Sequence, residues 1–381
     1  MTLFNCKLKF LFQILISLIL LLIFNEYIVY FLVLLKCQWP TLTTSIKSSS
    51  SVSSVYSGEF LKVMILADVH LLGSREGHWF DKLRREWQME RSFQTSMLVH
   101  DPDVVFILGD LFDEGKWCSD AEFQYYVNRF RSKFSTPERT RLYVVAGNHD
   151  MGFHYAIDDH KRMRFSKHLS SPLVQLLIIN GNAFVLLNSM AFEGDRCSMC
   201  TKAENELNDI IKKFKCAQIN GDDCMGNQVT YNPPIIMQHF PLYRESDANC
   251  SGPDSSPEDE KFMMMKPKWD CLDRNISNKI LTSLKPRLVF SGHTHHFCLT
   301  HHNRNQTPEW TVPSFSWRYK NLPSFLMMSL TPTAYDISKC YLPTESAVVS
   351  TYKYGVAVIF VFFLLYKKFN WCHRKSANKF G

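Results

Sequence analysis

The sequence lacks an internal repeat, and it lacks the excess charge of one sign that marks a nucleic-acid-binding surface. Its net charge of +7 comes from 43 basic and 36 acidic residues. Seven basic residues stand at the ends of the chain, at Lys7, Lys9, Lys367, Lys368, Arg374, Lys375 and Lys379. The rest of the chain holds 36 basic and 36 acidic residues, so it is about neutral. We therefore expect no nucleic-acid partner.

The long apolar run near the N-terminus lacks a small-residue cleavage site after it, because Cys-Gln-Trp-Pro comes next. The run covers residues 10–35 and is interrupted only by Gln13, Ser17, Asn25 and Glu26. It is long enough to span a hydrocarbon core of ~30 Å and too long for a signal peptide. We predict an uncleaved transmembrane helix, since a buried soluble helix would need protein around all its faces.

A second apolar segment, residues 347–366, is shorter, and Lys353 near its start must reach to the membrane interface. We predict that it is also a transmembrane helix. Outside the two segments, residues 1–9 and 367–381 contain basic residues but no acidic ones. By the positive-inside rule, both are cytoplasmic, the second as a basic tail, and the chain between them is luminal.

The luminal part begins with a Ser/Thr-rich linker, residues 36–59, which predicts a flexible tether. We expect a folded domain over residues 60–342. Sequons at Asn249 and Asn275 fit a luminal face, whereas the sequon at Asn305 is a poorer acceptor because proline follows it.

Cysteine usage agrees with an oxidising compartment. Nine of the 12 cysteines lie between Cys118 and Cys340, several of them in polar stretches. The pair Cys197-x-x-Cys200 lacks a second Cys-x-x-Cys or a His-x-x-x-His at the usual zinc-site spacing. Disulfides that pin surface insertions are thus favoured over half a zinc site. Because nine is odd, at least one thiol is free or pairs elsewhere.

Short β-rich runs alternate with amphipathic stretches through the luminal domain. Strands are predicted at 61–66, 104–108, 142–145, 176–179, 184–187, 235–237 and 288–290, and helices around 83–99, 120–133, 201–215 and 275–284. Asn180-Gly181 between two of these runs predicts a hairpin. After residue 296 the pattern becomes all β, so we predict an α/β domain with two packed sheets.

Five of these strands end in the same kind of residue. The strand ends carry Asp68 and His70; Asp110 and Asp113; Asn148, His149 and Asp150; His239; and His293 and His295. Open α/β folds gather their sites at the carboxyl ends of strands. Two divalent ions ~3.5–4 Å apart need a bridging carboxylate and terminal ligands on each side, and mixed oxygen and nitrogen donors suit manganese, iron or zinc. Glycines before Asp110, Asn148 and His293 let the backbone turn sharply there.

The five motifs resemble those of the calcineurin-like metallophosphoesterases: D-x-H, G-D-x-x-D, G-N-H-D, a lone histidine and G-H-x-H. The resemblance covers residues 61–300 and implies an α/β/β/α sandwich, here flanked by transmembrane helices, that hydrolyses phosphoric esters with two metal ions. It implies one metal on Asp68, His70 and His295, the other on Asn148, His239 and His293, with Asp110 bridging. It also implies catalysis by His149, oriented by Asp150, with Asp113 in a supporting role.

Segments outside these motifs, such as "GHWFDKLRREWQMERSFQ" and "PSFSWRYKNLPSF", resemble the membrane-bound members of the family that remodel GPI anchors after attachment. This implies removal of a side-chain ethanolamine phosphate from a mannose of the GPI glycolipid, with Mn²⁺. It also implies a place at endoplasmic reticulum exit sites, the intermediate compartment and the Golgi, with p24-type cargo receptors as partners. The tail departs from that group, because it lacks a dilysine-type retrieval signal.

Alternatives to this function remain open at the level of sequence. Trp79, His154, Tyr155, Trp317 and Arg318 are candidates to line a sugar or phosphate subsite, or they are ordinary packing residues. The enzyme could instead act on nucleotides or phospholipid head groups. A non-catalytic cargo-binding scaffold would predict eroded ligands, and none of the expected ligands is replaced.

Overall fold

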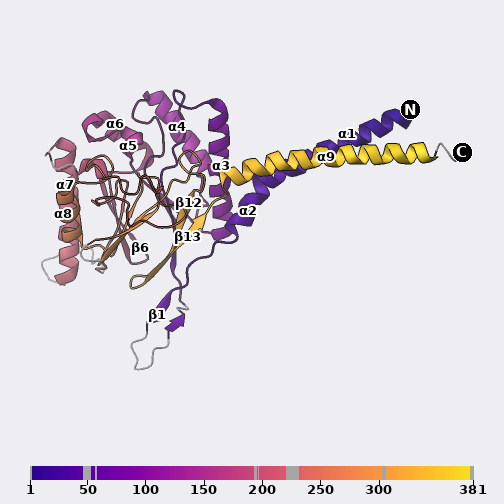
Figure 1. Cartoon of the computed structure of the whole chain (residues 1–381). Helices are drawn as coiled ribbons and strands as arrows, with labels where there is room; N and C mark the ends of the chain where they lie inside the picture. The colour runs from indigo at the N-terminus through magenta and orange to yellow at the C-terminus, as the bar shows by residue number, and fades with distance from the viewer. Residues whose placement is uncertain are drawn as a thin grey trace.

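The computed structural model describes residues 2–45, 53–55, 58–192, 195, 197–219, 231–302 and 306–377. The sequon at Asn305, the tail residue Lys379 and Cys224 lie outside these ranges. The described chain forms two mixed sheets packed face to face between helices, with a pair of long helices running out from one side (Figure 1).

The first sheet has five strands in the order β13-β12-β3-β4-β5. Its strands are β3 (Leu61–Leu66), β4 (Val104–Leu108), β5 (Arg141–Val145), β12 (Ser324–Leu330) and β13 (Tyr335–Tyr341). The pairs β3–β4 and β4–β5 are parallel, so their carboxyl ends lie at one edge of the sheet. β12 and β13 join antiparallel beside β3.

The second sheet has six strands in the order β10-β11-β9-β8-β7-β6. Its strands are β6 (Val174–Ile179), β7 (Asn182–Leu187), β8 (Ile235–Gln238), β9 (Leu288–Ser291), β10 (Cys298–His302) and β11 (Thr307–Thr311). β7, β8 and β9 are parallel neighbours. The predicted hairpin joins β6 to β7, and Asn180 and Gly181 both have left-handed φ values, 47° and 73°, as a type I′ turn requires.

Helices cover the outer faces of the two sheets. They are α3 (Trp79–His100), α4 (Asp120–Lys133), α6 (Asp159–Leu169), α7 (Ser198–Ile219) and α8 (Arg274–Leu284), while the short helix α5 (Asn148–Met151) follows β5. Figure 1 shows α3 and α4 on the side of the five-stranded sheet and α7 and α8 on the opposite side. This is the predicted α/β/β/α sandwich. Helix α6 was not predicted, because its charged sequence buries only Arg164 and Phe165 and carries no apolar periodicity.

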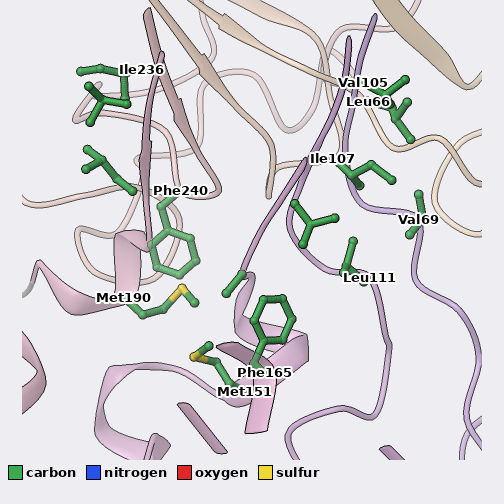
Figure 2. Close-up of a cluster of buried hydrophobic side chains, with 14 of the residues drawn as sticks. Leu66, Val69, Val105, Ile107, Leu111, Met151, Phe165, Met190, Ile236 and Phe240 are labelled. Atoms are coloured by element: carbon green, nitrogen blue, oxygen red, sulfur yellow. The ribbon is translucent and has the colours of Figure 1, made fainter. Parts of the chain in front are cut away.

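Strand side chains alternate between two apolar cores. Val63, Ile65 and Phe106 point between the sheets, where Phe106 and Phe184 meet at a ring-centroid distance of 5.0 Å. Their neighbours Met64, Leu66 and Ile107 belong to the second core, on the helix sides. Figure 2 shows part of that second core, which extends to Met151, Phe165, Met190 and Phe240. Two-residue periodicity thus explains why strands buried on both faces read as continuous apolar runs.

Two apolar helical segments leave the folded body together. The first comprises α1 (Thr2–Ile23), the π-helical turn η1 (Phe24–Ile28) and α2 (Val29–Leu34), and the second is α9 (Glu345–Ala377). Their stretches Phe10–Leu34 and Glu345–Lys368 are long and apolar enough to cross a membrane. They run side by side (Figure 1), with Phe10 against Phe363 and the Tyr352 hydroxyl bonded to Glu26.

The start of the predicted flexible tether is fastened to the body. Cys37 forms a disulfide with Cys340 of β13, and the Trp39 indole N–H donates to the carbonyl oxygen of His100 at 2.8 Å. Farther on, β1 (Thr43–Ser45) pairs antiparallel with β2 (Ser53–Val55). Low apolar content alone did not indicate these contacts, since they depend on one cysteine and one tryptophan that precede the Ser/Thr-rich stretch.

A second disulfide, between Cys250 and Cys298, ties the insertion after β8 to β10, as expected for an insertion pinned to the sheet. Cys216 is also disulfide-bonded. Cys118 and Cys271 are buried free thiols. Cys340, one of the nine cysteines counted between Cys118 and Cys340, pairs with Cys37 outside that range, as the odd number allowed.

Buried His100 makes the fold sensitive to acid. Its side chain is buried, its Nε2 has no hydrogen-bond partner among the described residues, and burial lowers its pKa from 6.5 to about 4. Between these two values the unfolded chain takes up a proton that the folded chain does not. Stability therefore falls as the pH drops through this window.

We predict that His100→Asn, which cannot titrate, flattens this pH dependence. The measurement is the thermal unfolding midpoint of the full chain in detergent at neutral and mildly acidic pH. Identical acid sensitivity of the variant and the parent protein would contradict the assignment.

Candidate metal centre

The carboxyl ends of five parallel strands, three from one sheet and two from the other, meet at one place. The predicted ligands follow these ends: Asp68 and His70 after β3, Asp110 after β4, Asn148 after β5, His239 after β8, and His293 and His295 after β9. All seven side chains come together there, within two overlapping groups of potential metal donors. Packing of the two sheets therefore assembles the site.

Asp110 stands between the two groups. Its Oδ2 lies 3.5 Å from His70 Nε2 and 3.4 Å from His239 Nε2, the position that a bridging carboxylate needs. On one side, His70 Nε2 is 3.1 Å from His295 Nε2 and 3.9 Å from Asp68 Oδ1. On the other, His239 Nε2 is 3.0 Å from Asn148 Oδ1 and 3.2 Å from His293 Nδ1.

The backbone is left-handed at most of these positions. Five non-glycine ligands have positive φ: Asp68 (53°), His70 (46°), Asp110 (48°), His293 (74°) and His295 (60°). Such conformations cost about 1–3 kcal/mol each and persist only where the surrounding structure enforces them. The strain turns each ligand sharply out of its strand toward the shared space between the sheets.

Glycines beside the ligands satisfy two different needs. Gly109 has a left-handed φ of 89°, which matches the predicted sharp turn. Gly147 has an ordinary φ of −111°, but a Cβ there would lie 2.2 Å from Asp110 Oδ1. The same lack of space applies at Gly292, where a Cβ would lie 2.8 Å from Asp68 Oδ2. The requirement at these two positions is therefore close approach, not turning.

The electrostatics of the cluster call for bound cations. Asp68 is fully buried, its Oδ1 accepts no hydrogen bond from any described residue, and burial raises its pKa well above the usual range. Burial would also raise the pKa of Asp110, but His239 and His149 outweigh it and hold that pKa well below its ordinary value. Burial lowers the pKa of His239, yet Asp110 raises it to about 9, so a metal would displace a proton there. Oxygen and imidazole donors of this kind fit two divalent ions.

The histidines are oriented by contacts on their other ring nitrogens. His239 Nδ1 lies 2.7 Å from the Leu108 carbonyl oxygen, and His293 Nε2 lies 2.6 Å from that of Trp269. His70 Nδ1 is 3.2 Å from Asp113 Oδ1. In each case the N–H donates outward and leaves the second nitrogen facing the centre, as metal-binding histidines require.

His149 lies beside the centre with its ring partly exposed. Its backbone N–H donates to Asp110 Oδ1 at 2.7 Å, and its Nδ1 lies 2.9 Å from the Asp113 carbonyl oxygen. Asp150, expected to orient His149, is bonded elsewhere: its carboxylate accepts from the backbone N–H groups of Gly147 and Phe112. The loop geometry thus depends on Asp150, and the contact to the His149 ring comes from Asp113.

Comparison with known proteins agrees with this geometry. The family model described as calcineurin-like phosphoesterase matches residues 61–297. The chain belongs to the calcineurin-like phosphoesterase family. It is 45% identical over 350 residues to Metallophosphoesterase 1 of Ailuropoda melanoleuca, covering 91% of this chain and 87% of the relative. Metallophosphoesterase 1 of Xenopus laevis is 46% identical over 360 residues, with the same two coverages.

A solved structure, the purple acid phosphatase PPD1 from yellow lupin, is similar to this chain with 11% sequence identity and a TM-score of 0.44. The match covers 81% of this chain and 60% of the phosphatase chain. Membership in the calcineurin-like phosphoesterase family together with the His/Asp cluster makes this chain a metal-dependent phosphoester hydrolase with a binuclear centre.

The predicted subsite residues of this phosphoesterase divide into two kinds. Arg318 lies near the centre, where it forms an ion pair with Asp113. Trp317 is buried and donates its indole N–H to the Pro343 carbonyl oxygen at 2.8 Å, so it is a packing residue and lines no subsite. His154 faces Asp195 and Met190 instead of the centre. Trp79 and Tyr155 are both exposed.

Two residues of the phosphoesterase site escaped the sequence analysis. The Tyr319 ring stacks on His295 at a centroid distance of 3.8 Å and meets His70 at 4.7 Å. Lys116 Nζ lies 3.5 Å from His149 Nδ1, and burial lowers its pKa. Both stand within stretches that carry the family resemblance, Tyr319 in "SWRYK" and Lys116 in "DEGKW". Their position next to Arg318 and Asp113 was the available clue.

We predict that Asp110→Asn lowers turnover by roughly 10³-fold or more and reduces bound metal, because the neutral amide cannot bridge two cations. Metal content and hydrolysis of an aryl phosphodiester by the full chain are the two measurements. Asp103→Asn, at the opposite end of β4, is the matched control and keeps both. Normal turnover of Asp110→Asn would refute the bridging role.

Proposed function

We propose that this phosphoesterase is a phosphodiesterase that removes a side-chain ethanolamine phosphate from a mannose of GPI anchors. The observation that carries the proposal is the placement of the centre in a body joined at both ends to side-by-side apolar helices. A substrate anchored in the same membrane would meet this centre at a raised effective concentration. The segment-level resemblance to GPI-remodelling members of the family supports the choice of substrate.

Two cations beside the centre suit a phosphodiester. Arg318 forms an ion pair with Asp113, and Lys116 Nζ lies 3.5 Å from His149 Nδ1. Guanidinium and ammonium groups bind the equatorial oxygens of a phosphoryl group and stabilise the charge that develops on them. We expect these two side chains to contact the phosphate oxygens that face away from the ligands.

An aromatic cluster at the rim suits a sugar. Phe153 lies 4.8 Å and Tyr155 5.9 Å from Trp269, measured between ring centroids, and Tyr155 is 73% exposed. Trp269 also accepts the hydrogen bond from His293, so the cluster begins one contact from the centre. Amphipathic aromatic faces of this kind pack well against the apolar faces of sugar rings. This cluster replaces Trp317 as the candidate mannose subsite.

The proposed reaction depends on His149 as the proton donor. The seven ligands would hold two divalent ions, whose positive charge would activate water and bind the phosphoryl oxygens. The Asp113 carbonyl oxygen holds the Nδ1–H of His149, which leaves Nε2 to carry the transferable proton. His149 would protonate the oxygen of the departing group, and Asp150 would keep the loop in place through Gly147 and Phe112.

We assign Mn²⁺ as the metal. The ligand set holds three oxygen donors, from Asp68, Asp110 and Asn148, and four imidazoles, without a thiolate. Such a set suits manganese, iron or zinc, and the resemblance to GPI-remodelling members favours manganese among them.

We also propose that the protein works between the endoplasmic reticulum exit sites and the Golgi, with a luminal body and cytoplasmic termini. Transport complexes with p24-type cargo receptors would bring it GPI-anchored proteins. The distribution of basic residues at the ends of the chain supports this orientation.

We predict that the full chain, in detergent and supplied with Mn²⁺, releases one ethanolamine phosphate from a GPI glycan, as detected by mass spectrometry. His149→Ala should lower the rate by roughly 10²–10⁴-fold while metal content stays the same. Loss of metal in that variant would make His149 a ligand.

The substrate class has its own control in the same assay. Nucleotide phosphodiesters and phospholipid head groups are offered in parallel, each with Asp110→Asn as the inactive reference. Cleavage of either of these, with the GPI glycan left intact, would keep the binuclear hydrolase and reject the GPI substrate.

The orientation is tested by glycosylation. Asn249 and Asn275 are both exposed in the structure, so a luminal body should carry sugar on at least one of them. A glycosidase shift on gels that disappears in the double variant Asn249→Gln/Asn275→Gln is expected. Digestion of the body by protease added to the cytosolic side of sealed vesicles, without any glycosidase shift, would overturn the topology.

A further inference from the structure

A second group of metal-binding side chains lies away from the binuclear centre. It contains His154 of η2 (His154–Ala156), Asp195, and Cys197 and Cys200 at the start of α7. One donor atom from each residue lies within 4.8 Å of all the others. By spacing alone, Cys197-x-x-Cys200 does not indicate a zinc site, because it has no matching pair at the usual distance along the sequence. The fold supplies the two missing donors from residues that no such spacing rule covers.

The distances between the donors fit one tetrahedral ion. Zn–S bonds of about 2.3 Å and Zn–N or Zn–O bonds of about 2.0 Å place neighbouring ligand atoms roughly 3.3–3.8 Å apart. Cys200 Sγ lies 3.3 Å from Asp195 Oδ1, which is within this range. Small side-chain rotations would therefore suffice to close the shell.

The contacts of His154 indicate a cation between it and Asp195. Its Nδ1 lies 2.9 Å from the Met190 carbonyl oxygen, so this nitrogen carries the N–H. Its Nε2 then presents a lone pair to Asp195 Oδ2 at 2.8 Å. Two lone pairs this close need a proton on Nε2 or, with the two atoms opened to about 3.3 Å, a metal ion that both atoms bind. A backbone carbonyl on the far nitrogen is the usual partner of a metal-binding histidine.

The two sulfurs decide between a proton and a metal. The backbone N–H of Cys200 donates to Cys197 Sγ at 2.9 Å, and both residues stand at the N-terminus of the long helix α7. An amide N–H and the positive end of a helix dipole both stabilise negative charge on sulfur. A carboxylate–imidazole ion pair has no need of two thiols, whereas a Cys₂HisAsp shell does. Thiolates select zinc, in contrast to the oxygen-rich binuclear centre.

We propose that His154, Asp195, Cys197 and Cys200 bind a structural zinc ion, separate from the two catalytic metals. The ion would join the start of α7 to η2, the segment that follows α5 (Asn148–Met151). Helix α5 itself carries Asn148 and His149 of the catalytic site. Met190, whose carbonyl holds His154, is itself part of the buried core beside Met151 (Figure 2). Zinc would thus fix the edge of the catalytic site to the helical layer.

The test is the metal content of the full chain, expressed in cells supplied with zinc and manganese and purified in detergent without chelators. We expect about one zinc per chain beyond the two metals of the centre. Cys200→Ser and His154→Gln should each lose that zinc and keep the binuclear metals. Asp110→Asn should do the reverse. Cys118→Ser, which removes a buried thiol elsewhere, is the matched control and should keep the zinc.

Cobalt provides a second readout, which is positive in the parent protein itself. Co²⁺ in a site with two thiolates gives a thiolate-to-cobalt absorption band, expected for the parent protein and for Asp110→Asn. The band should be absent from Cys197→Ser/Cys200→Ser. A Cys197–Cys200 disulfide found by mass spectrometry of unreduced protein would overturn the proposal, as would equal zinc in all variants.

Discussion

Everything in the catalytic site depends on a buried carboxylate that faces histidines on two sides. Asp110 is nearly inaccessible to water, and its Oδ2 lies within 3.5 Å of imidazoles from both sheets. A charge in such a place is tolerated only if it is paired, so the two sheets must meet at this point for the chain to fold as it does. Packing of the two sheets brings the ligands together, and it also requires positive charge at the centre to pair with the buried Asp110 carboxylate.

The arrangement of strands could be predicted because apolar runs and turn residues are local. β3 and β4 begin and end where the sequence placed them, and Asn180-Gly181 forms the expected turn. The convergence of Asp68, Asp110 and His293 followed from one general property, that parallel strands carry sites at their carboxyl ends. No local sequence signal predicted the left-handed backbone at Asp68 and His70, because tertiary contacts and not residue propensity impose it.

The side chains around the ligands were less predictable. Asp150 and Asp113 are both acidic residues next to the motifs, and only the three-dimensional path of the loop decides which one meets His149. Trp317 and Arg318 are adjacent in sequence, yet one faces the core and the other faces Asp113. The group around Cys197 joins three segments that no spacing rule connects. Local sequence therefore predicts where the strands end, but it does not predict which loop side chains contact one another.

The disulfide between Cys37 and Cys340 determines where mechanical load travels. Cys37 follows α2 directly, and Cys340 lies in β13 just ahead of α9, so the bond joins the chain's entry to the folded body with its exit. A force that pulls the two apolar helices apart would pass through this covalent link. It would bypass β3, β4 and the loops that hold the ligands. The strained backbone of the catalytic site is thereby shielded from tension that its anchors transmit.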